Sequence, residues 1–173
     1  MTRLPRPRAR APKQSLTSRR VLVVTPQPFY QDRGTPIALG LTCRALGELG
    51  YEVDLLAFPI GQDTVIPATR IRRCANPFGI RAVPIGFSAG KALLDLTLAH
   101  SFWHLMRTQD YGAVHAVEEA AYLAALLCPR LGMPFVYDMA SAIPVELRRH
   151  RILGTAVAQR GLAAFERLAL RRA

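Results

Sequence analysis

Short apolar runs alternate with segments of helical periodicity along the chain from Val21 onward. The first run, 21–24, has no polar position, which is typical of a strand buried on both faces in a parallel sheet. A helix is predicted next over 35–49, because Thr35 suits an N-cap, Pro36 the first helical position and Gly50 the stop. Its apolar residues recur every fourth position and so mark one face of the helix: Ile37, Leu41, Ala45 and Leu49. A strand at 51–58 completes a strand–helix–strand unit of about 38 residues, the length of a right-handed parallel crossover.

The same alternation continues through the rest of the chain. A Pro-rich connection over 59–87 contains a short predicted strand at 69–74. The elements predicted after it are a helix at 88–109, a strand at 111–117, a helix at 118–131 broken at Pro129, a strand at 135–137 and a helix at 155–172. The long helix carries its apolar positions on one face: Leu94, Leu98, Phe102, Leu105 and Met106. This order predicts an α/β fold, a Rossmann-like and mostly parallel sheet with helices on both faces.

The net charge of +11 is concentrated at the two ends of the 173-residue chain. Residues 1–20 hold seven basic residues and no acid, and 148–173 hold seven basic residues against Glu166 alone. The remainder, 21–147, has nine basic residues against eleven acids, so we expect no nucleic-acid partner. The Pro- and Arg-rich start predicts a disordered basic tail over 1–20 and one domain over 21–173.

Apolar content and cysteine usage narrow the class of protein further. Half of the residues are hydrophobic, which excludes a wholly disordered chain, and no run of about 18 uncharged apolar residues predicts a membrane-spanning helix. The three cysteines are widely spaced and contain no C-x-x-C pair, which argues against a zinc ribbon or a disulfide framework. A reducing compartment is therefore expected, and we predict a cytoplasmic location.

In open α/β sheets, ligands bind at the carboxyl ends of the strands, so the residues that follow each predicted strand are the candidates for a site. Arg33, Gly34 and Thr35 come directly before the first helix, where exposed N–H groups and the helix dipole suit a phosphate. The alternative is that Gly34 only permits a tight turn, and the sequence leaves both open. No G-x-G-x-x-G fingerprint occurs in the chain.

A second group of candidates lies at the ends of the strands predicted at 111–117 and 135–137. Glu118 and Glu119 come after His115, and could bind a hydroxylated substrate or handle a proton. Asp138 and Ser141 follow the last strand and could be ligands of the same site. Each has a structural alternative, because acids near a helix start are favoured by its dipole and Asp or Ser can cap a turn. Their convergence on one edge of the sheet favours a functional site.

Three partial motifs do not support the chemistry that they suggest. The segment 86–91 has one residue too few between its glycines for a phosphate-binding P-loop. Ser88 and Lys91 match S-x-x-K without the further motifs of a penicillin-binding site. His100 and His104 lie one turn apart, but Ser101 stands where a zinc protease needs Glu.

Taken together in their order, several of these segments resemble the N-terminal domain of a family-4-type glycosyltransferase of the GT-B architecture. The resemblance covers nearly all of 21–173. It rests on V-L-V-V-T-P (21–26), R-G-T-P-I (33–37), L-G-Y-E-V-D-L-L (49–56), P-I-G-Q-D (59–63), P-I-G-F-S-x-x-K (84–91), Asp95, Y-G-A-V-H-A-V-E-E-A-A (111–121) and P-F-V-Y-D-M-x-S (134–141).

The resemblance implies a retaining, metal-independent transfer of a sugar from a nucleotide-sugar donor to an acceptor, with no cofactor. It places Arg33, Gly34 and Thr35 near the donor phosphates. It places His115, Glu118 and Glu119 on the acceptor side of the cleft, and Asp138 and Ser141 at the end of the next strand. Many members carry a second histidine where this chain has Val117, which leaves Glu118 or Glu119 as substitutes. The resemblance also implies a C-terminal nucleotide-binding domain, lost or supplied in trans, without which the chain would be nearly inactive.

Two other functions remain possible from the sequence. The chain could be a non-catalytic α/β binding module that keeps the scaffold for interaction. The basic ends could also hold it at the anionic inner face of a membrane, and this role is compatible with the enzymatic one.

Overall fold

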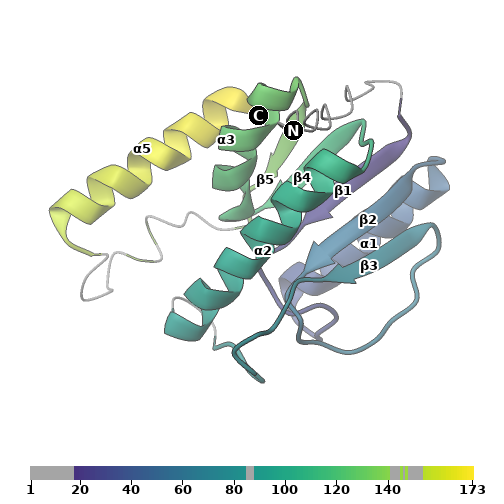
Figure 1. The fold of residues 1–173 in the computed structure, drawn as a ribbon, viewed down its shortest axis with the longest axis horizontal. Coiled ribbons are helices and arrows are strands. Elements are labelled where there is room, and N and C mark those ends of the chain that lie inside the picture. Colours follow the sequence, from purple (N-terminus) through teal and green to yellow (C-terminus); the bar gives the residue numbers. More distant parts are fainter. Residues whose placement is uncertain (1–17, 85–87, 141–144, 146, 148–153) are drawn as a thin grey trace, which may run out of the picture.

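Five parallel strands form the centre of the fold (Figure 1), in the order β3-β2-β1-β4-β5. The computed structural model describes residues 18–84, 88–140, 145, 147 and 154–173. The strands are β1 (Arg20–Val24), β2 (Glu52–Ala57), β3 (Thr69–Arg73), β4 (Ala113–Val117) and β5 (Phe135–Asp138). Every strand pair is parallel, and Val23 of β1 lies opposite Leu55 on one side and His115 on the other. The predicted fold class is confirmed.

Helices cover both faces of this sheet (Figure 1): α1 (Gly34–Glu48) lies behind it, and α2 (Ala89–Thr108) and α3 (Ala120–Leu131) lie in front. Helix α5 (Ala156–Arg172) packs mainly against α3. Successive residues of β1 point to opposite faces of the sheet: Leu22 and Val24 belong to the core cluster on one face, and Val21 and Val23 to the cluster on the other. The apolar run that predicted a doubly covered strand is therefore explained.

The long helix α2 confirms its prediction closely. Its buried residues are the five predicted ones, Leu94, Leu98, Phe102, Leu105 and Met106. Ser88 caps it, since its Oγ accepts the N–H of Lys91 at 3.1 Å. None of the helices in the described ranges is long and apolar enough to cross a bilayer.

The apolar face marked on α1 points to solvent. All four of its residues (Ile37, Leu41, Ala45 and Leu49) are exposed, and Pro36, Leu39 and Cys43 are buried instead. A helix turns about 100° per residue, so two positions four residues apart differ by about 40° around the helix axis. Ile37 and Leu49, which are three such intervals apart, therefore differ by about 120° and do not share a face. The buried three stay within about 60° of one another. The N-cap is Arg33 rather than Thr35, and Gly50, at φ +80°, lies just past the end of the helix.

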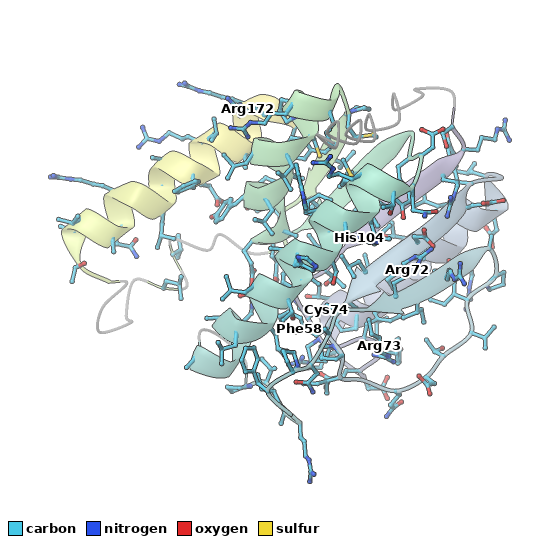
Figure 2. The ribbon with its side chains drawn as sticks, in the orientation of Figure 1. Phe58, Arg72, Arg73, Cys74, His104 and Arg172 are labelled. Carbon is cyan, nitrogen blue, oxygen red and sulfur yellow. The ribbon has the colours of Figure 1, made fainter. Side chains whose placement is uncertain are left out.

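The predicted break of the helix at Pro129 is wrong: α3 continues through Pro129, which lies within its last turn. A proline cannot donate to the carbonyl four residues earlier, and here that carbonyl, Ala125 O, accepts Arg172 Nη1 at 2.8 Å. Figure 2 shows Arg172 at the junction of α5 with α3. Helix α3 then stops at Gly132, whose φ of +66° is left-handed. The hydrogen bond from Arg172 to Ala125 O replaces the one that Pro129 cannot donate, and it joins α5 to α3.

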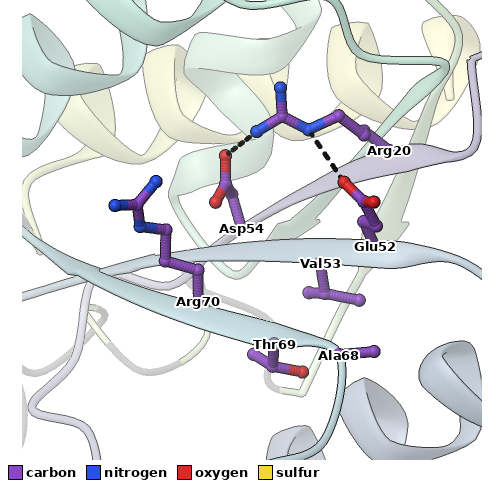
Figure 3. A pocket seen from close by; sticks show the side chains of 7 residues that line it. All are labelled: Arg20, Glu52, Val53, Asp54, Ala68, Thr69 and Arg70. Atoms are coloured by element: carbon purple, nitrogen blue, oxygen red, sulfur yellow. Dashed lines mark hydrogen bonds and ion pairs between the residues drawn. The ribbon is translucent and has the colours of Figure 1, made fainter.

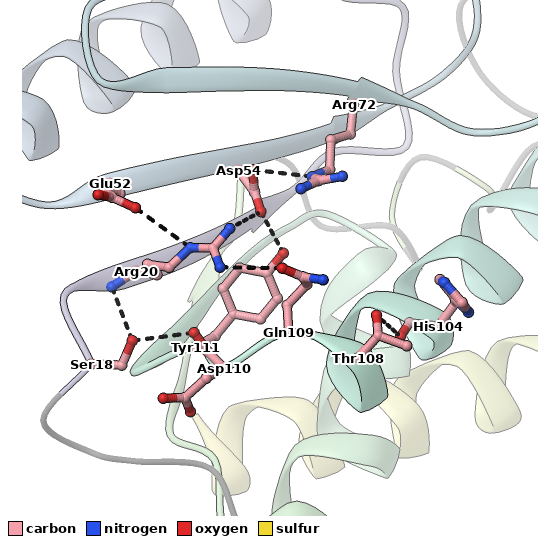
Figure 4. A network of polar contacts seen from close by, with 10 residues as sticks. All are labelled: Ser18, Arg20, Glu52, Asp54, Arg72, His104, Thr108, Gln109, Asp110 and Tyr111. Carbon is pink, nitrogen blue, oxygen red and sulfur yellow. Dashed lines mark hydrogen bonds and ion pairs between the residues drawn. The ribbon is translucent and has the colours of Figure 1, made fainter. Parts of the chain in front are cut away.

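Asp54 is the centre of a buried polar network between the strands (Figure 4). Its side chain is 3% exposed, and its carboxylate lies 3.0 Å from Arg20 Nη2 and 3.0 Å from Arg72 Nε. Tyr111 donates its hydroxyl to Asp54 Oδ2 at 2.6 Å. Burial, followed by this contact with Asp54, raises the pKa of Tyr111 well above its usual value. The network joins β1, β2, β3 and the segment between α2 and β4, where Tyr111 lies.

The last three residues of the predicted tail over 1–20 lie inside the described part of the chain. Ser18 donates its hydroxyl to Asp110 O at 3.1 Å, and Glu52 donates its N–H to Arg19 O at 2.9 Å. Residues 18–20 are thus part of the fold, while 1–17 lie outside the described residues.

Candidate functional site

The carboxyl ends of β4 and β5 bring His115 and Asp138 into contact. Val117 and Asp138 are register partners in the parallel pair, so the side chains near these ends lie side by side. His115 Nε2 lies 3.0 Å from Asp138 Oδ2. An ionised carboxylate can only accept, so the ring donates from Nε2 and its Nδ1 is left as the acceptor in the neutral form. The His115 side chain is 18% exposed and that of Asp138 is 42% exposed, so the pair is open to a ligand.

Glu118 follows β4 with its backbone in the left-handed region, at φ +50°. This conformation costs a non-glycine residue about 1 kcal/mol, and such strain is concentrated at functional sites. The surrounding structure holds it in place: its N–H donates to Asp138 O at 3.0 Å, and Gln27 Nε2 donates to its Oε2 at 2.7 Å. Glu118, His115 and Asp138 are therefore grouped at one edge, as the sequence predicted.

Glu119 has a different environment from its neighbour. Its Oε1 forms an ion pair with Lys91 Nζ, which also lies 3.6 Å from Asp95 Oδ2 and 5.6 Å from the centre of the Phe58 ring. Burial raises the pKa of Asp95, and the nearby Lys91 opposes that effect. Because Lys91 neutralises it, Glu119 is a weaker candidate than Glu118 for contact with a substrate.

Sequence reasoning did not identify Lys91 as part of this edge. Its signals in the sequence were the S-x-x-K match, which lacks the further motifs of a penicillin-binding site, and its place in the segment 84–91 of the family resemblance. Spacing cannot place the first turn of α2 beside the start of α3, because that contact depends on how the two helices cross the sheet.

The second group of candidates lies at the N-terminus of α1. The Arg33 N-cap makes no side-chain capping bond, and the first turn of α1 carries no acid. A Cβ added at Gly34 would meet nothing within 4 Å, and the φ of Gly34 lies outside the left-handed range. The fold therefore does not need glycine at this position. Arg33 Nε, in turn, is a buried donor with no hydrogen-bond partner among the described residues.

Arg73 fixes the loops that border this edge. Its Nη1 donates to Phe29 O at 2.7 Å and to Ile60 O at 3.1 Å, and its Nη2 donates to Gln62 O at 3.1 Å. Figure 2 shows Arg73 at the end of β3, beside these loops. Gly61 is required here, since its φ is +128° and a Cβ would lie 2.3 Å from Phe29 O. The loops on either side of the first crossover are therefore held together.

Glu166 connects α5 to the same region. The residue is 8% exposed, and its carboxylate accepts hydroxyl hydrogen bonds from Tyr122 and, at 3.2 Å, from Tyr137. Burial, followed by Glu166, raises the pKa of both tyrosines. This cluster was not predicted, because its members come from α3, β5 and α5.

A hollow of about 440 Å³ lies at the amino ends of β1, β2 and β3, the edge opposite to the candidate residues (Figure 3). It is lined by Arg20, Glu52, Val53, Asp54, Ala68, Thr69 and Arg70.

No group of three potential metal-ligating side chains occurs in the described part of the chain. Ser141 lies outside the described residues.

Comparisons with known proteins agree with the fold. Residues 33–173 match the family model described as the glycosyl transferase 4-like domain. Five chains of solved structures match, among them sucrose-phosphate synthase from Thermosynechococcus elongatus, with a TM-score of 0.67 at 15% identity. The match covers 89% of this chain and 40% of that one, and at this identity it shows the fold alone. No curated protein sequence matches significantly.

Proposed function

Because the chain belongs to the glycosyl transferase 4-like domain family, we propose that it forms the acceptor side of a glycosyltransferase active site. The reaction would be a retaining transfer, without a metal cofactor, from a nucleotide-sugar donor to an acceptor hydroxyl. The observation that carries the proposal is the grouping of Glu118, His115 and Asp138 at the carboxyl edge of the sheet. In folds of this class that edge binds ligands.

We assign Glu118 to the acceptor hydroxyl. A carboxylate oriented by Gln27 can accept a hydrogen bond from a sugar or alcohol O–H, and its strained backbone is consistent with a role other than stability. Glu119 is the weaker choice since Lys91 binds it. Val117 is fully buried, so the position of the family's second histidine offers no group to a substrate.

His115 and Asp138 are assigned to the proton of that hydroxyl. With Nε2 donating to Asp138, the free Nδ1 can accept a proton, and the carboxylate then stabilises the imidazolium. In the transfer, the acceptor oxygen bonds to the sugar's anomeric carbon, the bond from that carbon to the phosphate breaks, and the nucleotide diphosphate leaves.

Arg33, Gly34 and Thr35 are assigned to the donor phosphates. The uncapped N-terminus of α1, the open space at Gly34 and the unpartnered Arg33 Nε all favour an anion at this place. Gly34→Asp adds a negative charge there, while Gly34→Asn adds the same volume without charge. We expect the aspartate variant to bind a nucleotide sugar at least about tenfold more weakly than the asparagine variant, because like charges repel at this range.

Catalysis is proposed to need a second, nucleotide-binding domain. Much of the power of an enzyme comes from holding both reactants together, so the acceptor half alone should be nearly inactive. The donor, the acceptor and this domain are the partners that the proposal implies. A cytoplasmic location stays a prediction from cysteine usage.

The test is a sugar-nucleotide hydrolysis and transfer assay. It is run with the chain alone and with a C-terminal domain supplied from a relative. Activity only in the mixture supports the proposal. No activity in the mixture, with both parts folded by circular dichroism and bound to each other, would favour a non-catalytic binding module.

A further inference from the structure

The helices in front of the sheet differ strongly in charge from the helix behind it. Helix α1 carries one base and one acid, Arg44 and Glu48. The front layer of α2, α3 and α5 carries seven bases: Lys91, Arg107, Arg130, Arg160, Arg167, Arg171 and Arg172. Its only acids are Asp95, which is paired with Lys91, and Glu166, which is 8% exposed. The outward surface of these three helices is therefore basic.

Part of the terminal charge excess thus belongs to a folded surface. Arg160, Arg167 and Arg171 are exposed on α5 and spaced by seven and four residues, so they form one stripe along the helix. Arg130 is exposed at the end of α3, which packs against α5. The sequence had placed this charge at an end of the chain, and the structure places it on a helix face.

Large apolar side chains are exposed on the same layer. Leu96 is 68% exposed and Trp103 39% exposed on α2, and Phe165 and Leu170 are 46% and 53% exposed on α5. Arg107 stacks on Trp103, with its Cζ 5.1 Å from the ring centre. Figure 2 shows His104, the residue after Trp103, on the outer side of α2. On α2, Leu96, Trp103 and Arg107 share one outward face, since their positions lie within about 40° of one another around the helix. On α5, Phe165 lies about 140° from Arg160 around the helix and its ring centre is 6.1 Å from that of Tyr122, so it flanks the basic stripe. Arginine beside exposed Trp and Leu, as on α2, is typical of helices that lie on a membrane surface.

We propose that the outward surface of α2, α3 and α5 docks on a bilayer that contains anionic lipids. The absence of an exposed unpaired acid in the described part of these helices gives charge complementarity. The exposed apolar side chains would enter the headgroup region, where a nucleic acid or an acidic protein offers less apolar contact. This inference does not depend on the proposed transferase chemistry, since none of the assigned site residues takes part.

Trp103 provides the readout, because it is the single tryptophan of the chain. The full chain is titrated with vesicles of phosphatidylcholine alone or mixed with phosphatidylglycerol, and flotation is measured in parallel. We expect a blue shift of the Trp103 emission and co-flotation only with the anionic vesicles, both weakened by salt. Equal binding to neutral vesicles, or no binding to either, would overturn the proposal.

Two triple variants separate a specific surface from total charge. Arg160→Gln, Arg167→Gln and Arg171→Gln together should weaken binding by more than about a hundredfold, since each base near an anionic surface contributes about a factor of five. The matched control, Arg44→Gln, Arg70→Gln and Arg81→Gln, removes the same charge from exposed positions outside the layer and should change binding by only a few fold.

The remaining outcomes are also decisive. Equal loss in both triple variants would reduce the effect to net charge and overturn the proposal. Loss on deleting 1–17, with the α5 variant unaffected, would assign binding to the basic start of the chain instead. Tighter binding to an RNA or DNA oligomer than to anionic vesicles would also contradict it. Circular dichroism and unfolding midpoints within a few degrees of wild type confirm that the variants are folded.

Discussion

Asp54→Asn should destabilise the fold far more than the loss of an exposed ion pair does. The substitution keeps the shape of the side chain and an acceptor for Tyr111, but removes the charge that lies between two guanidiniums, each at 3.0 Å. Breaking a buried pair by neutralising one partner costs about 3–5 kcal/mol. The side chains of Arg20 and Arg72 are 31% and 25% exposed, so water relieves part of this cost, and we expect about 3 kcal/mol.

Glu52→Gln is the matched control, because Glu52 also pairs with Arg20. That pair spans 3.6 Å, and the Glu52 side chain is 77% exposed, so its loss should cost at most about 0.5 kcal/mol. For a chain of this size the two substitutions correspond to a fall in Tm of about 6–12 °C and of less than about 2 °C.

The assay is thermal and urea unfolding at pH 7, followed by circular dichroism at low and high salt. The effect of Glu52→Gln should vanish in about 1 M salt, while that of Asp54→Asn should persist because the site is buried. If Asp54→Asn lay within about 1 kcal/mol of Glu52→Gln, the idea that this carboxylate holds the strands together would be refuted.

Three further predictions concern pH and the candidate edge. The pKa of Tyr111 is raised in the folded chain, and that of Cys43 is raised to about 12. As pH rises, these two side chains therefore ionise in the unfolded chain before they ionise in the folded one. Stability is then full below the unfolded pKa values, and above them each group lowers the free energy of unfolding by about 1.4 kcal/mol per pH unit, measured by urea unfolding between pH 8 and 11. Glu118→Asn should raise stability by up to about 1 kcal/mol, since Asn tolerates left-handed backbone, while ligand binding by calorimetry falls; unchanged binding would remove Glu118 from the site. Lys91→Met should destabilise the chain by about 1–2 kcal/mol at pH 7. Because the pKa of Asp95 is already raised, the loss should shrink as acid protonates that group, and a loss that grew with acid would contradict this.

Much of the fold could be predicted because local pattern and global packing agree. The run 21–24 has to be covered on both faces, and the alternation of strands and helices leaves few arrangements other than a parallel sheet. The face of α1 could not be predicted from four-residue spacing, since the direction of the helix over the sheet decides which side is buried. Pro129 was misjudged for a similar reason, as Arg172, a residue distant in sequence, supplies the missing donor.

The candidate site was predictable where it depends on strand ends alone. His115 and Asp138 lie near the carboxyl ends of parallel strands, so their place at one edge of the sheet was predicted. Their direct contact was not predicted, because it depends on β4 and β5 being neighbours, and the sequence does not give the strand order. The difference between Glu118 and Glu119 was not, because it depends on Lys91 and on a left-handed backbone angle that composition does not reveal.

The most direct test of the central claim is the transfer rate of the Glu118→Gln variant, assayed with the supplied C-terminal domain. The account predicts a loss of at least about a hundredfold, with thermal stability near that of wild type, while Glu52→Gln at the opposite edge keeps the full rate. A folded Glu118→Gln variant that transfers sugar at the wild-type rate would contradict the assignment of the active site to the carboxyl edge of the sheet.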